Sequence, residues 1–250
     1  MPDVTAPKST SLTGTTRFVR YAFMPNRLQY CGGDDNAEIF AYALAEVREP
    51  PLDAMLRKFA GAMPYLSLIA RGNGILDPFD DRVVEAYWLG NELLERVEVG
   101  DLYGSLRERY SGQISPKLMN LVAAKAPAGA RPHHCFHVFD VWRNVEHLGG
   151  DVLATMDSCR VSWGLVRSVD GSDVTVARRP LVMREGKLAL AEEQTERATL
   201  LLDGHGFAAP IVGDTVSLHW GWVCEVLTPR QTSNLERYTR QHLTLANHTI

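Results

Sequence analysis

Cysteine is scarce in this chain, with four residues in 250, which is too few for a disulfide framework in a chain of this length. Basic residues are not in excess, because 26 Lys and Arg stand against 30 Asp and Glu, so the charge balance does not favour a nucleic-acid partner. No long apolar run is present, and no apolar stretch near the start has the form of a signal peptide. These absences predict a protein of a reducing cytoplasm that binds neither nucleic acid nor a membrane.

The first half of the chain has the apolar spacing of helices. Residues 1–15 are rich in Ser, Thr and Pro and predict a mobile tail. From about residue 36 to residue 125, apolar side chains recur at intervals of three and four. The predicted helices cover residues 36–47, 52–62, 65–70, 77–97, 101–110 and 116–125.

The period changes after about residue 151, where short β-branched runs alternate with Asp-Gly and Glu-Gly turn signals. The predicted strands cover residues 152–156, 161–169, 174–178, 181–183, 187–191, 198–202 and 215–226. Thr228-Pro229 with Gln231 then has the form of a capping box that begins a last helix. The predicted fold is therefore α+β: an all-α N-terminal domain over 16–150, then a small OB-like β-barrel with a closing C-terminal helix over 151–250.

Cys159 and His219 are the leading candidates for a metal site. Cys159 precedes the predicted strand 161–169, and His219 lies near the Trp-Gly-Trp segment of the predicted strand 215–226. A thiolate and a neutral imidazole are ligands of iron, zinc and nickel. If the two segments are neighbours, this part of the chain carries a metal or a metal complex.

The spacing around these two residues is similar to that of a known family. Ser158-Cys159, four residues and Gly164, together with the segment from Val212-Gly213-Asp214 to His219, resemble the hydrogenase-assembly chaperones of the HypC/HupF type, and residues 228–246 match their closing helix. The resemblance implies a β-barrel that carries the Fe(CN)2(CO) fragment of [NiFe]-hydrogenases on Cys159, with His219 as second ligand. It also implies two partners, an iron–sulfur scaffold protein that supplies the fragment and the hydrogenase large subunit that receives it.

A second cluster lies in the segment from Pro132 to His137. His133, His134 and His137, with Cys135, can supply ligands for a second metal in the N-terminal half. On a helix, His133 and His137 would share a face. The same residues also suit turns and a core, with histidines that bond to backbone groups and a buried Cys135.

The segment from Tyr30 to Asp35 is the third candidate. Cys31 precedes two glycines and a predicted helix start, which would favour its thiolate, and Asp34 or Asp35 can be a hard metal ligand. An ordinary junction in which Asp35 caps the helix explains the segment equally well. This segment, residues 83–88 and the histidine cluster also resemble an uncharacterised bacterial family found among hydrogenase genes, a resemblance that implies no activity.

Three functions remain open from the sequence. The first is a carrier for the iron fragment in [NiFe]-hydrogenase maturation, with the helical half binding a partner or extending the site through His133, His134 or His137. The second is a non-haem iron or zinc enzyme of hydrogenase cofactor assembly, which would form or deliver the CO ligand at a site of those histidines with Asp34 or Asp35. The third is a protein-binding adaptor whose histidines are all structural.

Overall fold

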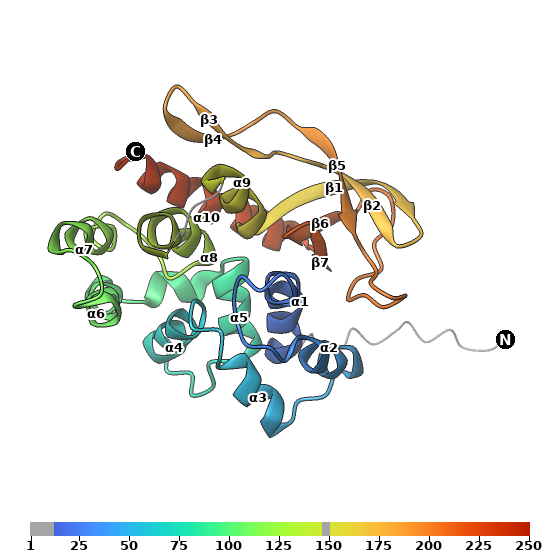
Figure 1. Ribbon diagram of the computed structural model, residues 1–250, viewed down its shortest axis with the longest axis horizontal. Helices are drawn as coiled ribbons and strands as arrows, with labels where there is room; N and C mark the ends of the chain where they lie inside the picture. The colour runs from blue at the N-terminus through green and yellow to red at the C-terminus, as the bar shows by residue number, and fades with distance from the viewer. Residues whose placement is uncertain (1–12, 147–150) are drawn as a thin grey trace.

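The computed structural model describes residues 13–146 and 151–250. Helices form the first half, a β-barrel follows, and a long helix closes the chain, so the fold is α+β as the sequence predicts (Figure 1). The helices are α1 (Gly14–Arg27), α2 (Asn36–Ala45), α3 (Pro50–Leu56), α4 (Met63–Gly72), α5 (Asp81–Trp88), the 3-10 helix η1 (Glu92–Arg96), α6 (Val99–Tyr110), α7 (Pro116–Ala123), α8 (His134–Phe136), the π-helix η2 (His137–Glu146), α9 (Val152–Cys159) and α10 (Pro229–Asn247).

The strands form a closed barrel and a separate hairpin. They are β1 (Ser162–Asp170), β2 (Asp173–Arg178), β3 (Leu181–Arg184), β4 (Lys187–Leu190), β5 (Gln194–Thr199), β6 (Thr215–His219) and β7 (Trp222–Val226). The barrel order is β1-β2-β5-β7-β6, with β5 and β7 parallel and the other neighbours antiparallel. The hairpin β3-β4 is inserted between β2 and β5, so the five barrel strands have the OB-like form that the sequence predicts.

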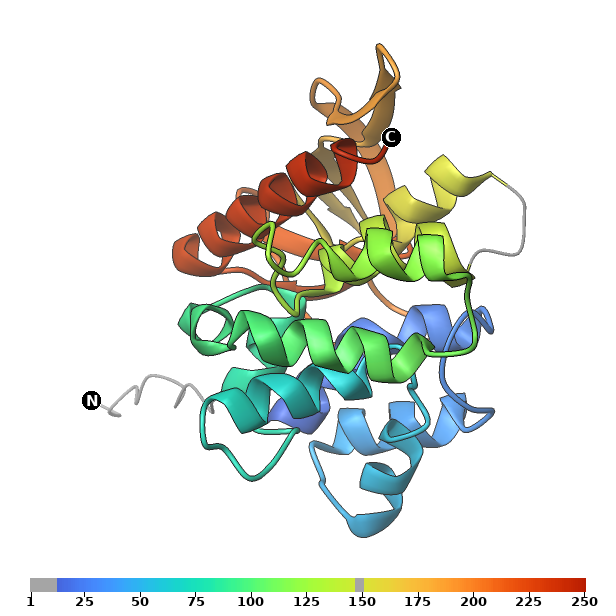
Figure 2. The same cartoon turned by 90° about the vertical axis from the view of Figure 1, so that its left-hand side faces the viewer.

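The closing helix α10 begins with the predicted capping box. The Thr228 side chain accepts a hydrogen bond from the backbone of Gln231, and the Gln231 side chain accepts one from the backbone of Thr228. Pro229 follows at the first helical position, where a missing N–H costs nothing. The helix runs between the barrel side of the molecule and the helical half and packs against α8, η2 and β4 (Figure 2).

The main hydrophobic cluster of the helical half extends to β7 of the barrel, while the barrel interior forms a cluster of its own. Helix α1 packs against β6 and β7, and Phe23 of α1 meets Trp222 of β7 at a ring-centroid distance of 5.3 Å. Glu225 of β7 is buried and accepts a 2.7 Å hydrogen bond from the Tyr21 hydroxyl, while Arg17 lies 3.3 Å from the same carboxylate. Burying that carboxylate is tolerable only because both partners from α1 satisfy it. The two parts of the chain therefore depend on each other for packing.

Residues 152–156 begin a helix, and the strand predicted there is wrong. The Asp151 side chain caps α9 by accepting a 3.0 Å hydrogen bond from the Ala154 backbone. Val152 and Met156, four residues apart, lie on one helical face and join the apolar cluster beside η2. A segment this short does not distinguish the helical period of about 3.6 residues from the strand period of about 2, and its β-branched residues gave a false strand signal.

The predicted strand 215–226 is two strands joined by a tight turn. Trp220 and Gly221 both have positive φ angles, 55° and 68°. A two-residue turn with this backbone suits a β-hairpin because its twist matches that of the strands. His219 is therefore the last residue of β6 and lies beside the turn.

Several other boundaries differ from the prediction. Helix α1 was not predicted; Thr13 caps it and Thr15 is buried in its first turn, so the tail does not extend to residue 15, and residues 1–12 lie outside the described residues. The single helix expected over 77–97 is instead α5, which begins at Asp81 because Asp80 caps it by accepting from the Arg82 backbone, followed by the separate η1. Strand β5 lies earlier than the predicted 198–202, and the expected domain boundary at 149–150 is outside the described residues.

No helix within the two described segments is both long enough and apolar enough to cross a membrane.

Candidate metal centre

Three side chains from different parts of the chain bring metal-ligand atoms together. One ligand atom each from His134, Cys159 and His219 lie within 4.8 Å of one another. His134 is in α8, Cys159 ends α9, and His219 ends β6. Among the described residues this is the one group of three or more such side chains with that spacing. The proximity of Cys159 and His219 that the sequence suggested is therefore found, with His134 added from the helical half.

The end of α9 is fixed to the barrel, and this places Cys159. The Trp220 backbone donates a 2.8 Å hydrogen bond to the Ser158 carbonyl, which links α9 to the turn that follows His219. The Asp157 carboxylate accepts from Arg178 at 2.9 Å and from the Leu181 backbone at 2.8 Å. Because these bonds reach β2, β3 and the β6-β7 turn, Cys159 is held at the barrel rim next to His219.

His219 presents a bare lone pair. Its Nδ1 lies 2.6 Å from the carbonyl oxygen of Tyr21, and since a carbonyl only accepts, Nδ1 carries the proton and donates. Its Nε2 is buried and makes no hydrogen bond to a described residue, although the Cys159 carbonyl lies near enough to raise the pKa of the ring. Burial lowers the pKa of His219 to about 4, against the opposing effect of the Tyr21 and Cys159 carbonyls. The ring is thus neutral near pH 7, with its unprotonated Nε2 available to a metal.

His134 is also neutral, but both of its nitrogens are engaged. Its Nε2 donates to the Cys159 carbonyl at 2.8 Å, and its Nδ1 therefore accepts from the Tyr87 hydroxyl at 3.0 Å. Burial lowers the pKa of His134 well below its usual value, and the imidazoles of His219 and His137 lower it further. A metal at Nε2 would replace the bond to Cys159 and move the proton to Nδ1, where the Tyr87 oxygen can accept it.

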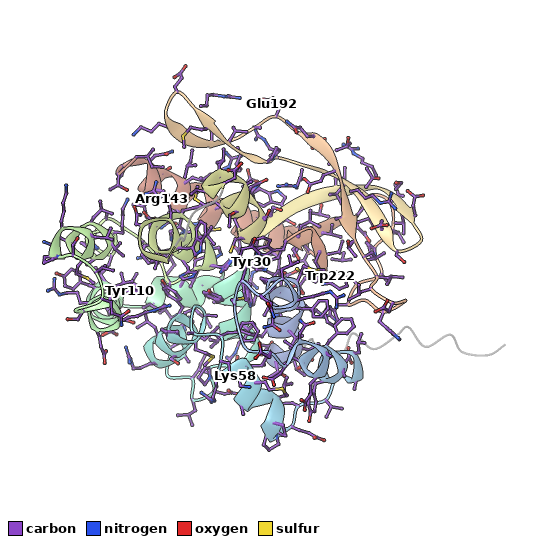
Figure 3. All side chains as sticks on the ribbon, viewed as in Figure 1. Tyr30, Lys58, Tyr110, Arg143, Glu192 and Trp222 are labelled. Carbon is purple, nitrogen blue, oxygen red and sulfur yellow. The ribbon has the colours of Figure 1, made fainter. Side chains whose placement is uncertain are left out.

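The three residues line a cavity of about 290 Å³ at the junction of the helical half and the barrel. Trp88 forms part of its wall, with its ring centroid 4.6 Å from that of His134 and 5.5 Å from that of His219. Tyr30, labelled in Figure 3, stacks on Trp220 at 4.0 Å beside the cavity. Since a water molecule takes up about 30 Å³ of liquid, the cavity has room for a metal ion and several further atoms.

The histidine cluster of residues 133–137 divides between two places. His134 and His137 line the cavity, one helical turn apart, with 6.2 Å between their ring centroids. His133 has an extended backbone and caps α8, its Nδ1 accepting a 3.1 Å hydrogen bond from the Cys135 backbone. The predicted sharing of a helical face by His133 and His137 is therefore wrong, because the helix begins one residue later.

Cys135 lies away from the cavity. Its sulfur is buried 3.5 Å from the Thr239 hydroxyl of α10, and burial raises the pKa of its thiol to about 11. Cys224 is buried too, in β7, with its sulfur 3.6 Å from the Trp222 carbonyl. Trp220 lines the cavity, whereas Trp222 is in the core.

The segment from residue 31 to residue 35 meets the cavity at one point. Cys31 is exposed and lines the cavity, but it is not part of the three-residue group. The protein around its sulfur raises the pKa of its thiol to about 12, so the prediction that its thiolate is favoured is wrong. Asp34 is exposed and does not line the cavity, and Asp35 forms an ion pair with Lys58. Asp35 stands at the N-cap of α2 without a side-chain bond to the helix. The ligand set of histidines with Asp34 or Asp35 is therefore not assembled here.

Two residues that support the site were not identified from the sequence. Tyr87 bonds to His134, and Tyr21 offers its carbonyl to His219. Tyr87 lies on an amphipathic helix, where an aromatic residue is an ordinary core position. The contribution of Tyr21 is a backbone group, which no side-chain motif reports. Tyr87 lies in the segment 83–88, whose resemblance implied no activity, and Tyr21 carried no signal in the sequence.

The donor set suits a metal of intermediate softness. A thiolate with two neutral imidazoles binds zinc, iron, nickel or copper in preference to magnesium or calcium, which favour oxygen ligands. Three protein ligands leave at least one coordination position for another group. The carbonyl that orients His219 is the kind of outer partner that metal-bound histidines usually have.

Comparison with known proteins gives a family without a function. No curated protein matches the chain, and no solved structure does. One family profile matches residues 10–250, across both the helical half and the barrel, and so includes all three residues of the candidate centre. The chain belongs to that family, described as a family of unknown function (DUF6390).

Proposed function

We propose that this protein binds a metal through His134, Cys159 and His219, and that its cargo is the iron fragment of [NiFe]-hydrogenase assembly. The observation that carries the proposal is the buried, unpartnered Nε2 of His219 in the same group as the Cys159 sulfur. An unsatisfied buried polar atom costs about 1–3 kcal/mol, and a bound metal would remove that cost.

The ligand atoms need little movement to hold one ion. Metal–nitrogen bonds of about 2.0 Å and metal–sulfur bonds of about 2.3 Å put tetrahedral ligand atoms about 3.3–3.6 Å apart. The three atoms already lie within 4.8 Å. Side-chain rotations that move the ligand atoms by about 1 Å would bring them to these distances. The His134 ring would then give up its hydrogen bond to the Cys159 carbonyl.

The identity of the cargo rests on the resemblance to HypC/HupF-type chaperones. Cys159 and His219 occupy the positions that the resemblance gives to the two ligands of the Fe(CN)2(CO) fragment. The cavity of about 290 Å³ has room for cyanide and carbonyl groups beside the iron. The proposed partners are the iron–sulfur scaffold protein that supplies the fragment and the hydrogenase large subunit that receives it, in the cytoplasm.

Metal binding itself is tested by titrating the purified chain with Co²⁺ under anaerobic conditions. We expect a thiolate-to-cobalt charge-transfer band in the near ultraviolet that is lost in Cys159→Ser. His205→Ala removes an exposed histidine outside the cavity and serves as the control that keeps the band. A wild-type chain with no such band, or a band that survives Cys159→Ser, contradicts the proposed centre.

The cargo is tested by infrared spectroscopy. The chain is produced together with a hydrogenase-assembly system and purified without oxygen. Cyanide and carbonyl stretches that are present in the wild type and absent from Cys159→Ser support the carrier. A chain that binds Co²⁺ through Cys159 but never shows these stretches is a metal protein with a different cargo.

A second function, a metal-dependent enzyme of hydrogenase cofactor assembly, is favoured by one observation. The third ligand, His134, comes from the helical half, and three protein ligands with an open position are typical of catalytic zinc and non-haem iron sites. A carrier releases its metal complex to the large subunit and is left without metal. An enzyme keeps its metal through repeated turnovers, so metal content measured before and after transfer separates the two functions.

A further inference from the structure

Cys31 lies at the edge of the candidate metal centre, in a loop that side-chain hydrogen bonds hold in place. The Asn26 side-chain amide donates to the carbonyls of Cys31 and Gly33, at 2.8 and 2.6 Å. Asn36 in turn donates to the Asn26 side-chain oxygen at 3.1 Å. These bonds fix the backbone on both sides of Gly32 and therefore the position from which the Cys31 side chain starts.

Two further contacts hold the same loop against the site. Tyr30 stacks on Trp220, the residue that follows His219, with ring centroids 4.0 Å apart. Gly32 has a φ of +82°, and a Cβ there would lie 2.6 Å from the Phe59 ring, so only glycine fits. The loop is thus pinned to the β6-β7 turn on one side and to the wall of the cavity on the other.

Cys31 reaches both solvent and the cavity. The residue is exposed and lines the same cavity as Cys159 and His219, while the protein around its sulfur raises the pKa of its thiol to about 12, so a metal must displace the thiol proton as it binds. Its sulfur does not belong to the group whose ligand atoms lie within 4.8 Å. The buried Nε2 of His219, which has no partner among the described residues, shows independently that this cavity is prepared for an electron-pair acceptor. A second thiol at the solvent side of such a cavity is placed to meet the metal first.

We infer that Cys31 is an entry and exit ligand, which passes a thiophilic metal ion between solvent or a donor protein and the inner centre. The inference depends on the proposed metal centre. In the entry step a metal–sulfur bond forms at Cys31, whose thiol releases a proton. Bonds from the metal to the Cys159 sulfur and His219 Nε2 then form as the Cys159 thiol releases its proton. The Cys31–metal bond breaks and Cys31 takes a proton back, so no electron is transferred and one proton is released in total.

An entry ligand changes rates and leaves the equilibrium alone. The full chain and its variants are mixed with Co²⁺ in a stopped-flow instrument, and the bound metal is then removed with EDTA. In Cys31→Ser we expect loading and removal each to slow by about tenfold or more. The dissociation constant should stay within about threefold of the wild type, because both rates fall together.

Two variants sharpen the result. Cys31→His places another ligand of intermediate softness at the edge, and we expect it to restore most of the rate. Thr155→Ala changes another residue that lines the cavity and offers no metal ligand in either form, so it should keep wild-type rates. Thermal melts check that each variant is folded, which is expected of Cys31→Ser because the residue is exposed.

Three outcomes overturn the inference. Unchanged rates in Cys31→Ser mean that the metal enters by another route. A loss of affinity as large as that of Cys159→Ser means that Cys31 is a permanent ligand. A wild-type chain that binds no Co²⁺ removes the metal centre itself, and the inference with it. The first two outcomes leave the proposed function standing.

Discussion

His133 and His219 are both buried imidazoles, and they differ in which ring nitrogen carries the proton. His219 donates from Nδ1 to a backbone carbonyl, so its Nε2 faces the cavity as a bare lone pair. His133 accepts at Nδ1 from the Cys135 backbone, so its Nε2 carries the proton; this Nε2 is also buried without a hydrogen bond to a described residue, and the Leu89 backbone raises the pKa of the ring against the effect of burial. The first arrangement leaves a lone pair for a metal, and the second forms a helix cap; His134 has the tautomer of His133 and would have to move its proton to Nδ1 to bind through Nε2.

His219 and His133 lie in two different regions of the molecule. The junction of α9 with the β6-β7 turn gathers a thiol and two imidazoles around a cavity. The contact between α8 and α10 stacks His133 on His242 at 5.7 Å, and His242 has both nitrogens bonded to backbone groups. Clustering of histidines in the sequence therefore does not identify the site; the place of each ring in the fold does, because His134 and His219 line the cavity and His133 does not.

Substitution of His219 and of His133, each in its own variant, gives the largest expected difference in Co²⁺ affinity. His219→Gln removes a ligand and should weaken Co²⁺ binding by more than about 100-fold, because loss of an outer partner alone costs about 10–100-fold. His133→Asn removes an imidazole but keeps a good capping residue, and affinity should stay within about threefold. Competition with a chelator measures both. Equal losses in the two variants would contradict the comparison.

Acid should destabilise the fold through its buried histidines. Burial lowers the pKa of His219 to about 4 from an ordinary value of 6.5, so the unfolded chain binds more protons between these values. The contribution to the free energy of unfolding is complete above about pH 6.5 and is lost as the pH falls toward 4, by about 3 kcal/mol for this residue.

Urea unfolding at a series of pH values measures the effect. His242, whose pKa burial also lowers to about 4, adds a second decline of the same sign. His219→Gln should show a smaller decline than the wild type over the same interval, whatever its stability near neutral pH. A wild-type free energy that stays level from about pH 6.5 to about pH 4 would show that these rings are not buried as neutral groups.

Tyr87 tests which nitrogen of His134 binds the metal. The Tyr87 hydroxyl lies 3.0 Å from Nδ1, and Nε2 points at the residue that bears the thiol. If the metal binds at Nε2, Tyr87 becomes the acceptor for the Nδ1 proton, and Tyr87→Phe should weaken Co²⁺ binding by about tenfold. Stronger binding in this variant would mean that Nδ1 is the ligand and that the hydroxyl competes with the metal.

The smallest effect is expected far from the centre. Thr228 caps α10, and Thr228→Ala should lower the free energy of unfolding by about 1 kcal/mol. Metal affinity should not change, because α10 supports the His133 side of the molecule and contributes no ligand. Denaturant unfolding and a Co²⁺ titration on the same preparation give both values, and a matching loss of affinity would show that the two regions are coupled.

Local signals predicted much of the fold and singled out two of the three residues of the centre, Cys159 and His219. The capping box at Thr228 and the turn signals between strands depend on neighbours in the sequence, and the structure confirms them. The spacing that singled out Cys159 and His219 also led to two side chains that lie together. Helix caps and turns can be predicted from a sequence because the residues that form them are only a few positions apart.

The remaining parts depend on contacts between distant segments. His134 is the first residue of α8 and lines the cavity, whereas His133 is the N-cap and does not, and the sequence did not fix the residue at which α8 begins. Helix α9 was taken for a strand because residues 152–156 are too few to show a period. The carbonyl of Tyr21 acts on a residue 198 positions away, and no motif records it.

The central claim is that one ion binds between two imidazoles and one thiolate. X-ray absorption spectroscopy of the zinc-loaded full chain tests it most directly. We predict one sulfur at about 2.3 Å and two imidazole nitrogens at about 2.0 Å, with the sulfur lost in Cys159→Ser. A zinc shell of oxygen atoms alone, or one that is the same in wild type and Cys159→Ser, would contradict it.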